Sequence, residues 1–245
     1  MEKSLCIVLR TADYRDNDKM LTLFSHDLGK LDALSRGCKK GTSSLLACSQ
    51  IFTCGMYSYY IRQGKYYISQ CEITDSFYTL REDVERFSVA AYIAEATEKV
   101  INHDDPNQRL FSLVANCFYA LKNGAGSLQA LVFFMVKFSD IAGYRPNIYS
   151  CVICGKKTTK TGNNFSYNEG GVVCAACARG LHTHKISSEA LVAIHEICSV
   201  SSKSVSSFDK EKTLLYELYH LFVGYIENKL ERKLYSAEFL KRIFL

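Results

Sequence analysis

Four of the eleven cysteines form two close pairs whose spacing suits metal binding. Each pair encloses two residues, nineteen residues lie between the pairs, and the four members are Cys151, Cys154, Cys174 and Cys177. Two such Cys-x-x-Cys knuckles present four thiolates that can close a tetrahedron at about 2.3 Å from a Zn²⁺ ion. Because four cysteine ligands leave no open coordination position, the pattern predicts one structural Zn²⁺ rather than a catalytic metal.

The segment around these cysteines, residues 147–180, predicts an irregular, metal-sized element. Residues 165–167 and 172–173 could form a small hairpin between the two pairs. Such a fragment has too little core to order itself, so the metal would supply the missing free energy of folding. His182 and His184 follow the second pair and could replace a cysteine ligand, although exposed loop histidines are the simpler interpretation.

Other interpretations of the cysteines have less support. A redox pair of the thioredoxin type needs a strand–loop–helix context, and a nucleobase-deaminase site needs His-x-Glu upstream of Pro-Cys-x-x-Cys. The sequence has neither feature, and four unrelated thiols would rarely fall at this spacing. The other seven are interpreted as small hydrophobic residues or surface thiols: Cys6, Cys38, Cys48, Cys54, Cys71, Cys117 and Cys198.

A second group with a chemical role is the basic stretch at residues 30–40. Its basic side chains are those of Lys30, Arg36, Lys39 and Lys40. Such groups bind phosphate backbones through the release of counterions, with little sequence preference. A short basic cluster also serves solubility, so the stretch alone leaves DNA binding and solubility open.

Tyrosines are concentrated at residues 57–67. They are Tyr57, Tyr59, Tyr60, Tyr66 and Tyr67. Aromatic side chains on small barrels stack on nucleic-acid bases, but more often they pack in the core or across strands. Strand alternation puts Tyr57 and Tyr59 on one face and Tyr60 on the other, so at least some should be packing residues.

The basic stretch and the tyrosines fall in a region whose pattern predicts strands. The predicted strands are residues 4–11, 19–26, 31–35, 50–61 and 65–72. A glycine-containing loop at residues 62–65 predicts a hairpin between the last two. About five strands in about 80 residues favour a small closed barrel of the OB type over a sandwich, which usually needs about seven.

Beyond residue 80 the apolar period becomes helical. The predicted helices are residues 84–98, 110–121, 128–142, 188–198, 213–234 and 237–244, with a pause in the serine-rich residues 199–207. The predicted fold class is therefore α+β and multi-domain. An OB-fold β-barrel spans residues 1–80, and an all-α helical domain with a four-cysteine zinc-binding insertion spans residues 81–245.

Composition excludes several classes of protein. With 48% hydrophobic and 22% charged residues, the 245-residue chain is globular rather than disordered. Its purest apolar run, residues 130–136, is too short to span a bilayer because Lys137 and Asp140 interrupt it. The start lacks a signal-peptide pattern and the cysteine count is odd, so a cytoplasmic protein with reduced thiols is expected. The net charge of +5 permits a polyanionic partner.

Motifs for covalent catalysis are absent from the sequence. There is no Gly-x-Ser-x-Gly elbow, no Walker phosphate loop and no Gly-x-Gly-x-x-Gly, and the six histidines are scattered. We therefore expect a binding protein and not an enzyme. A redox or metal-dependent enzyme would need a reactive thiol or an open metal position.

The order of these features resembles the RecO family of bacterial recombination mediators. The similar segments near the start are Tyr14-Arg15-Asp16, Leu21-Thr22-Leu23-Phe24, Leu28-Gly29-Lys30 and Arg36-Gly37. Later ones are Gly143-Tyr144-Arg145-Pro146, the two cysteine pairs with Gly170-Gly171, and Leu234-Tyr235-Ser236. The resemblance covers nearly the whole chain.

The resemblance implies an OB-fold domain, a helical domain and, as in many members, a zinc-binding element. It implies a non-enzymatic protein of the bacterial cytoplasm and nucleoid that binds single- and double-stranded DNA and anneals complementary strands. With RecR, such proteins help load RecA onto DNA covered by single-stranded DNA-binding protein (SSB), whose tail contacts the helical domain. The family's DNA-binding charge corresponds here to Lys30, Arg36, Lys39 and Lys40, and its zinc ligands to Cys151, Cys154, Cys174 and Cys177.

A competing hypothesis is a zinc-stabilised protein-interaction adaptor that does not bind nucleic acid. The net charge of +5 is low for a chain whose main ligand is DNA. Tyrosine-rich surfaces also suit protein partners. Both hypotheses remain open at the level of sequence.

Overall fold

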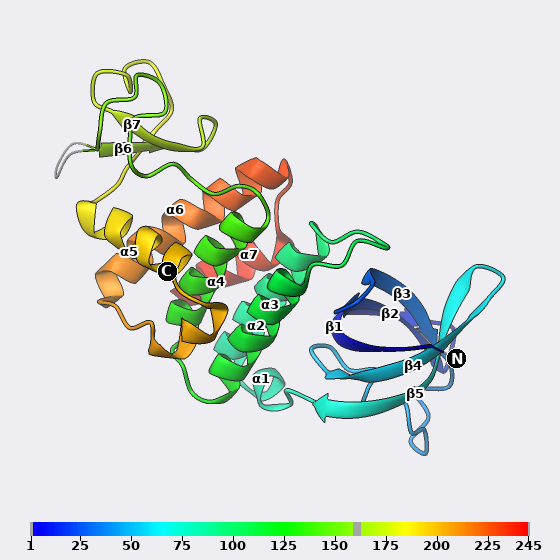
Figure 1. The fold of residues 1–245 in the computed structure, drawn as a ribbon. Helices are drawn as coiled ribbons and strands as arrows, with labels where there is room; N and C mark the ends of the chain where they lie inside the picture. Colours follow the sequence, from blue (N-terminus) through cyan, green and yellow to red (C-terminus); the bar gives the residue numbers. More distant parts are fainter. Residues whose placement is uncertain (1, 159–162, 245) are drawn as a thin grey trace. The chain divides into compact units, whose positions relative to one another are not determined.

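The computed structural model describes residues 2–158 and 163–244, which fall into two compact units. The first unit runs to Lys122 and the second starts at Asn123. Figure 1 shows a barrel and helices in the first unit, and helices with a small sheet in the second. The predicted order of a barrel followed by helices is confirmed.

Five strands close the barrel of the first unit. They are β1 (Glu2–Tyr14), β2 (Asp18–Ser25), β3 (Gly29–Ser35), β4 (Cys54–Arg62) and β5 (Lys65–Asp75). The order around the barrel is β1-β2-β3-β5-β4, and β3 pairs with β5 in parallel while the other neighbours are antiparallel. Closure leaves no long unpaired edge, which is how small barrels protect their backbone hydrogen bonds.

The barrel core follows strand alternation. Tyr57 and Tyr59 are buried inside, whereas Tyr60 is 40% exposed, as the alternation predicts. The Tyr57 hydroxyl donates a 2.6 Å hydrogen bond to the carbonyl of Cys48, so its polar end is satisfied. The prediction of a strand from residue 50 is wrong at its start, because Phe52 has φ +73° and β4 begins only at Cys54.

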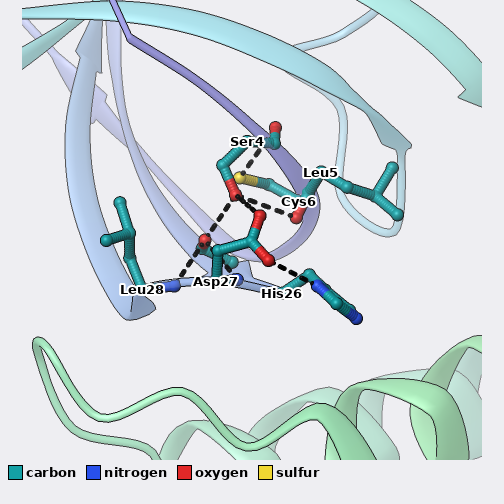
Figure 2. Close-up of polar contacts among 7 residues, drawn as sticks. Ser4, Leu5, Cys6, His26, Asp27 and Leu28 are labelled. Carbon is teal, nitrogen blue, oxygen red and sulfur yellow. Dashed lines mark hydrogen bonds and ion pairs between the residues drawn. The ribbon is translucent and has the colours of Figure 1, made fainter.

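The turn between β2 and β3 is closed by side-chain hydrogen bonds (Figure 2). The Ser25 hydroxyl accepts from the N–H groups of Asp27 and Leu28 at 3.2 and 3.0 Å. It also shares a 2.6 Å hydrogen bond with the hydroxyl of Ser4 on β1. His26 Nδ1 lies 2.7 Å from Asp27 Oδ1, so the polar side chains of this turn are paired with one another.

Three helices follow the barrel in the first unit: α1 (Thr79–Glu82), α2 (Val84–Glu98) and α3 (Gln108–Lys122). Asp83 caps α2, its side chain accepting from the N–H of Arg86 at 2.8 Å. Phe52 packs edge-on against Phe118 of α3 at 5.3 Å between ring centroids, which joins barrel and helices in one core.

The chain between α2 and α3 touches the start of β3 at Gly29. This glycine has φ +73°, and a Cβ atom there would lie 2.4 Å from the carbonyl oxygen of Asn102 and 2.5 Å from that of Asp105. The neighbouring N–H of Lys30 donates to the same Asn102 oxygen at 2.8 Å. Only glycine fits this position, because the backbone conformation and the close approach both exclude a side chain.

The second unit contains α4 (Ser127–Ile141), α5 (Ser188–Ser199), α6 (Lys212–Leu230) and α7 (Tyr235–Phe244), with a 3₁₀ helix at Ser202–Ser207 in the serine-rich pause. The predicted helix over residues 213–234 is too long, because Glu231 turns left-handed at φ 53° and ends α6 at Leu230. No helix among the described residues is long and apolar enough to cross a membrane.

A buried lysine lies within the apolar helix α4. Lys137 is 6% exposed, and its Nζ donates to the carbonyls of Ile197, Cys198 and Val200 at the end of α5. Carbonyls at a helix end lack partners within the helix, so a lysine there satisfies them and favours the local dipole. These hydrogen bonds from Lys137 therefore hold the end of α5 against α4.

Candidate metal centre and nucleic-acid interface

The four paired cysteines lie on a three-stranded sheet and its loops in the second unit. The strands are β6 (Asn163–Ser166), β7 (Gly171–Cys174) and β8 (His184–Lys185), in the order β7-β6-β8. Phe165 pairs with Val172, which confirms the predicted hairpin. The first cysteine pair precedes β6, and the second spans the end of β7 and the turn after it.

The thiols of Cys151, Cys154, Cys174 and Cys177 converge, with all four Sγ atoms within 4.8 Å of one another. The Cys154 and Cys174 sulfurs are 3.8 Å apart. A tetrahedral ion with ligands at about 2.3 Å would separate its sulfurs by about 3.8 Å. The arrangement therefore fits one thiolate-bound metal ion, as the spacing predicts.

The surroundings of the cluster also favour the negatively charged thiolate form of Cys151. Burial raises the pKa of Cys151, but hydrogen bonds from the N–H groups of Cys174, Cys154 and Ile153 outweigh it and lower that pKa to about 6. The pKa of Cys177 is raised, chiefly by its hydrogen bond with the Cys174 thiol. In the metal-free cluster the thiols thus share protons, which a cation would displace.

The histidines after the second cysteine pair have another role. Among the described residues, the group able to hold a metal contains four cysteines and no histidine. The His184 ring stacks on Tyr167 at 4.2 Å, and His182 packs edge-on against His184 at 5.1 Å. Burial, and then the charge of His182, lower the pKa of His184. These rings therefore pack against the small sheet.

The sheet is seated on helix α6. A Cβ atom at Gly224 would lie 2.7 Å from ring atoms of Tyr167, so the tyrosine lies directly on the helix backbone. Phe165 meets the ring of Tyr225 edge-on at 5.2 Å, and the Tyr225 hydroxyl donates to the carbonyl of Tyr144 at 2.8 Å. Aromatic packing, together with hydrogen bonds from Asn228 and Lys229 of α6 to Asn168, holds the cysteine sheet on the second unit.

The four basic residues predicted to bind DNA lie in two places along β3. Lys30 is at the start of the strand, where its Nζ lies 3.8 Å from a carboxylate oxygen of Glu98 on α2. Glu98 is only 12% exposed and also holds Arg10 at 3.1 Å. Lys30 is thus partly neutralised by an acid from the first unit's own helices.

The other three follow the end of β3. Arg36 lies over the ring of Tyr67, with 4.6 Å from its guanidinium carbon to the ring centre. Lys39 pairs with Asp13 at 3.0 Å, and Lys40 is exposed with no ion-pair partner among the described residues. These three form the part of the predicted set that faces solvent at one end of the barrel.

Beside Arg36 the barrel has a cavity of about 560 Å³ that the basic stretch alone does not reveal. Two of the interleaved tyrosines, Tyr66 and Tyr67, line it. Its other charged or polar lining residues are Asp32 on β3, Lys65 beside Tyr66, Tyr14 at the end of β1 with Arg15 after it, and His103 and Asp104 in the loop after α2. Residues 103–104 were not among the predicted site residues, because no local pattern in the sequence indicates that the loop after α2 reaches the barrel.

Comparison with known proteins covers almost the whole chain. The family model described as "Recombination protein O N terminal" matches residues 1–77, and that described as "Recombination protein O C terminal" matches residues 81–238.

Similar proteins include three described as "DNA repair protein RecO". The one from Acetivibrio thermocellus is 28% identical over 98% of this chain and 96% of its own. Those from Clostridium novyi and Desulforamulus reducens are 30% and 31% identical, covering 98% and 97% of this chain and 94% and 93% of their own.

Proposed function

The chain belongs to the RecO family of DNA repair proteins, and from this premise we propose that it is a recombination mediator. It binds single- and double-stranded DNA, anneals complementary strands and, with RecR, helps load RecA onto SSB-coated DNA. It acts in the cytoplasm at the nucleoid and is not an enzyme. The observation that supports this most is the barrel surface beyond β3, where Arg36, Lys39 and Lys40 are exposed and Arg36 covers the Tyr67 ring.

The mechanism rests on charge screening. Two phosphate backbones repel each other, and lysine and arginine side chains lower that repulsion while leaving base edges free to pair. Annealing by this route needs no nucleotide hydrolysis and no covalent step. Lys39 and Lys40 are suited to it because they are exposed and outside the barrel core; Lys40 has no ion-pair partner among the described residues, and Lys39 would exchange its pair with Asp13 for a phosphate.

The metal site has a structural role in this proposal. Cys151, Cys154, Cys174 and Cys177 would hold one Zn²⁺, and because all four ligands would come from the protein, the ion would serve structure and not catalysis. The ion would then order the described parts of residues 147–180, and the helical unit would present that surface to partners such as RecR or the SSB tail.

The test follows duplex formation from labelled complementary strands, bare or coated with SSB, without nucleotide and at increasing salt. Acceleration in both cases that falls steeply with salt supports the mediator. No acceleration and no DNA retention at low salt would contradict it and favour the protein-interaction adaptor.

A paired variant locates the surface. Lys39→Glu with Lys40→Glu should weaken binding to every sequence and reduce the salt slope by about two, one for each lost phosphate contact. Lys203→Glu with Lys233→Glu makes the same charge change at exposed positions of the second unit and is the control. Equal effects of the two pairs would remove the β3 end from the DNA site.

A further inference from the structure

The parallel contact between β3 and β5 is the starting point. The two strands pair over only two positions, Ala33 with Tyr66 and Leu34 with Tyr67, whereas the antiparallel neighbours pair over many more. The cavity of about 560 Å³ described above lies at this contact, because Leu34, Tyr66 and Tyr67 all line it. An aromatic base with its sugar needs less room than this, and Leu34 and Tyr67 supply an apolar floor.

Three planar side-chain groups stack on one another beside the cavity. The Tyr60 and Tyr67 rings lie parallel within 12° at 5.3 Å, and the Arg36 guanidinium lies over the Tyr67 ring at 4.6 Å. Tyr60 comes from β4 and Arg36 follows β3, the strands on the two sides of β5, so the Tyr67 ring lies between them. Arg36 lines the cavity and Tyr60 does not, so the stack presents the guanidinium to it.

Both basic and acidic side chains line the cavity. Arg15 and Lys65 are exposed on its rim with Arg36, a pattern that suits phosphate. Asp32 and Asp104 line it as well, where they would repel phosphate but accept hydrogen bonds from amino or imino groups. Asp32 already accepts from the Thr22 hydroxyl at 2.8 Å and lies 3.5 Å from His103 Nε2, so Asp104 is the acid left for a ligand.

We propose that this cavity receives one unpaired base of a DNA strand, stacked on Arg36 with its phosphate on the basic rim. The inference rests on the proposed DNA binding and adds a preference to it. Bases stack on guanidinium planes and aromatic rings, and such contacts strengthen single-strand binding. A paired base reaches the cavity only after leaving the duplex, which costs its stacking and pairing.

The preference has a consequence for annealing. A single strand is held by base and phosphate together, whereas a duplex keeps only its phosphate contacts. Pairing with a complementary strand withdraws the base from the cavity, so the product leaves more readily than either substrate. The cavity thereby favours release at the moment of duplex formation.

The test compares single-strand and duplex affinity at one salt concentration for Arg36→Gln and Lys40→Gln. Both variants remove one exposed positive charge, but only Arg36 lines the cavity. We expect Lys40→Gln to weaken both forms equally. Arg36→Gln should weaken duplex binding by the same factor as Lys40→Gln but single-strand binding about tenfold more. Equal losses on both forms for both variants would overturn the proposal.

Two further arms identify the source of the base. A single strand of abasic residues should lose the advantage over duplex, and on it Arg36→Gln should match Lys40→Gln. Competition by free mononucleotides at concentrations near those of the strand would instead assign the cavity to a free nucleotide and overturn the strand assignment. If the wild-type protein binds neither single strands nor duplex, the DNA-binding proposal itself fails, a result distinct from loss of the preference.

Discussion

The barrel and the cysteine element, residues 147–180, are both built around antiparallel strands, yet different forces hold them. The barrel closes five strands of 7 to 13 residues around a continuous buried core. The cysteine element contains two strands of 4 residues, extended by the 2-residue β8 just beyond it, and buries few apolar side chains besides Phe165, Val172 and Val173. Tyr149 and Ile153 remain at least half exposed. Closure stabilises the barrel, whereas the cysteine element has little core of its own and four thiols placed to hold a metal ion that would join its two cysteine pairs.

Metal removal should produce the largest difference between the two regions. Cys154→Ser with Cys177→Ser, or a strong chelator, should abolish metal binding and release the amides of residues 147–180 to solvent exchange, because the ion replaces a missing core. Amides of the barrel should keep their protection. Hydrogen exchange read by mass spectrometry, with metal content measured on the same samples, checks this.

Cys198→Ser is the control for those variants, since this thiol lies outside the cluster. It should keep the metal and the protection pattern. Loss of metal without a change in protection would show that the element is held by its aromatic contacts alone.

The barrel should be most sensitive where its chain approaches another backbone. Gly29→Ala introduces a Cβ within 2.5 Å of two carbonyl oxygens and should cost about 3 kcal/mol of unfolding free energy. Gly37→Ala has a similar φ, +64°, but open space around it, so only the backbone cost of about 1 kcal/mol is expected. Urea unfolding measures both, and equal losses would mean that the close approach to Asn102 is relaxed in solution.

The contact between the cysteine element and α6 should contribute less to stability than the metal ion does. In an open helix Gly→Ala stabilises by about 1 kcal/mol, but at Gly224 the Tyr167 ring blocks the new Cβ, so a net loss of about 1–2 kcal/mol is expected. Adding Tyr167→Leu should recover the helix gain. The double-mutant cycle, measured by thermal unfolding with metal bound, tests the contact, and additive effects would refute it.

Acid should have the smallest effect, confined to the edge strand β8. The pKa of His184 is lowered from its ordinary 6.5 mainly by burial, and its Nε2 finds no hydrogen-bond partner among the described residues. A depressed histidine pKa favours folding of the neutral form, so its contribution is present above about pH 6.5 and is lost as pH falls toward the folded pKa. His184→Phe should flatten the fall in melting temperature below that pH. His220→Gln, an exposed histidine, should not.

The cysteine centre was predictable because its information is local. A Cys-x-x-Cys knuckle fixes its own geometry within a few residues, so spacing alone identified the four ligands that the structure brings together. Strand alternation likewise put Tyr57 and Tyr60 on opposite faces, and the structure shows that the face of Tyr57 is the inner one. The left-handed residues Phe52 and Glu231 were missed because neither is a residue type that favours that conformation.

The availability of the basic side chains was less predictable, because their partners come from positions that are distant in the sequence. Lys30 and Arg36 are six positions apart in sequence, yet one meets Glu98 and the other Tyr67. The partner of Lys30 lies on a helix 68 positions later, and no pattern near residue 30 reports it. Sequence therefore identifies which residues carry charge, while packing decides which of those charges remain available to a ligand.

The contact at Gly29 also bears on where a functional part of this chain can be cut. It anchors the loop whose next residues, His103 and Asp104, form one wall of the cavity on the barrel. The first family match ends at residue 77, so a fragment cut there would contain all five strands but lack that wall. The segment that the first family model matches is thus shorter than the segment that encloses the cavity, and chimeras that exchange the barrel between relatives should be joined after α3.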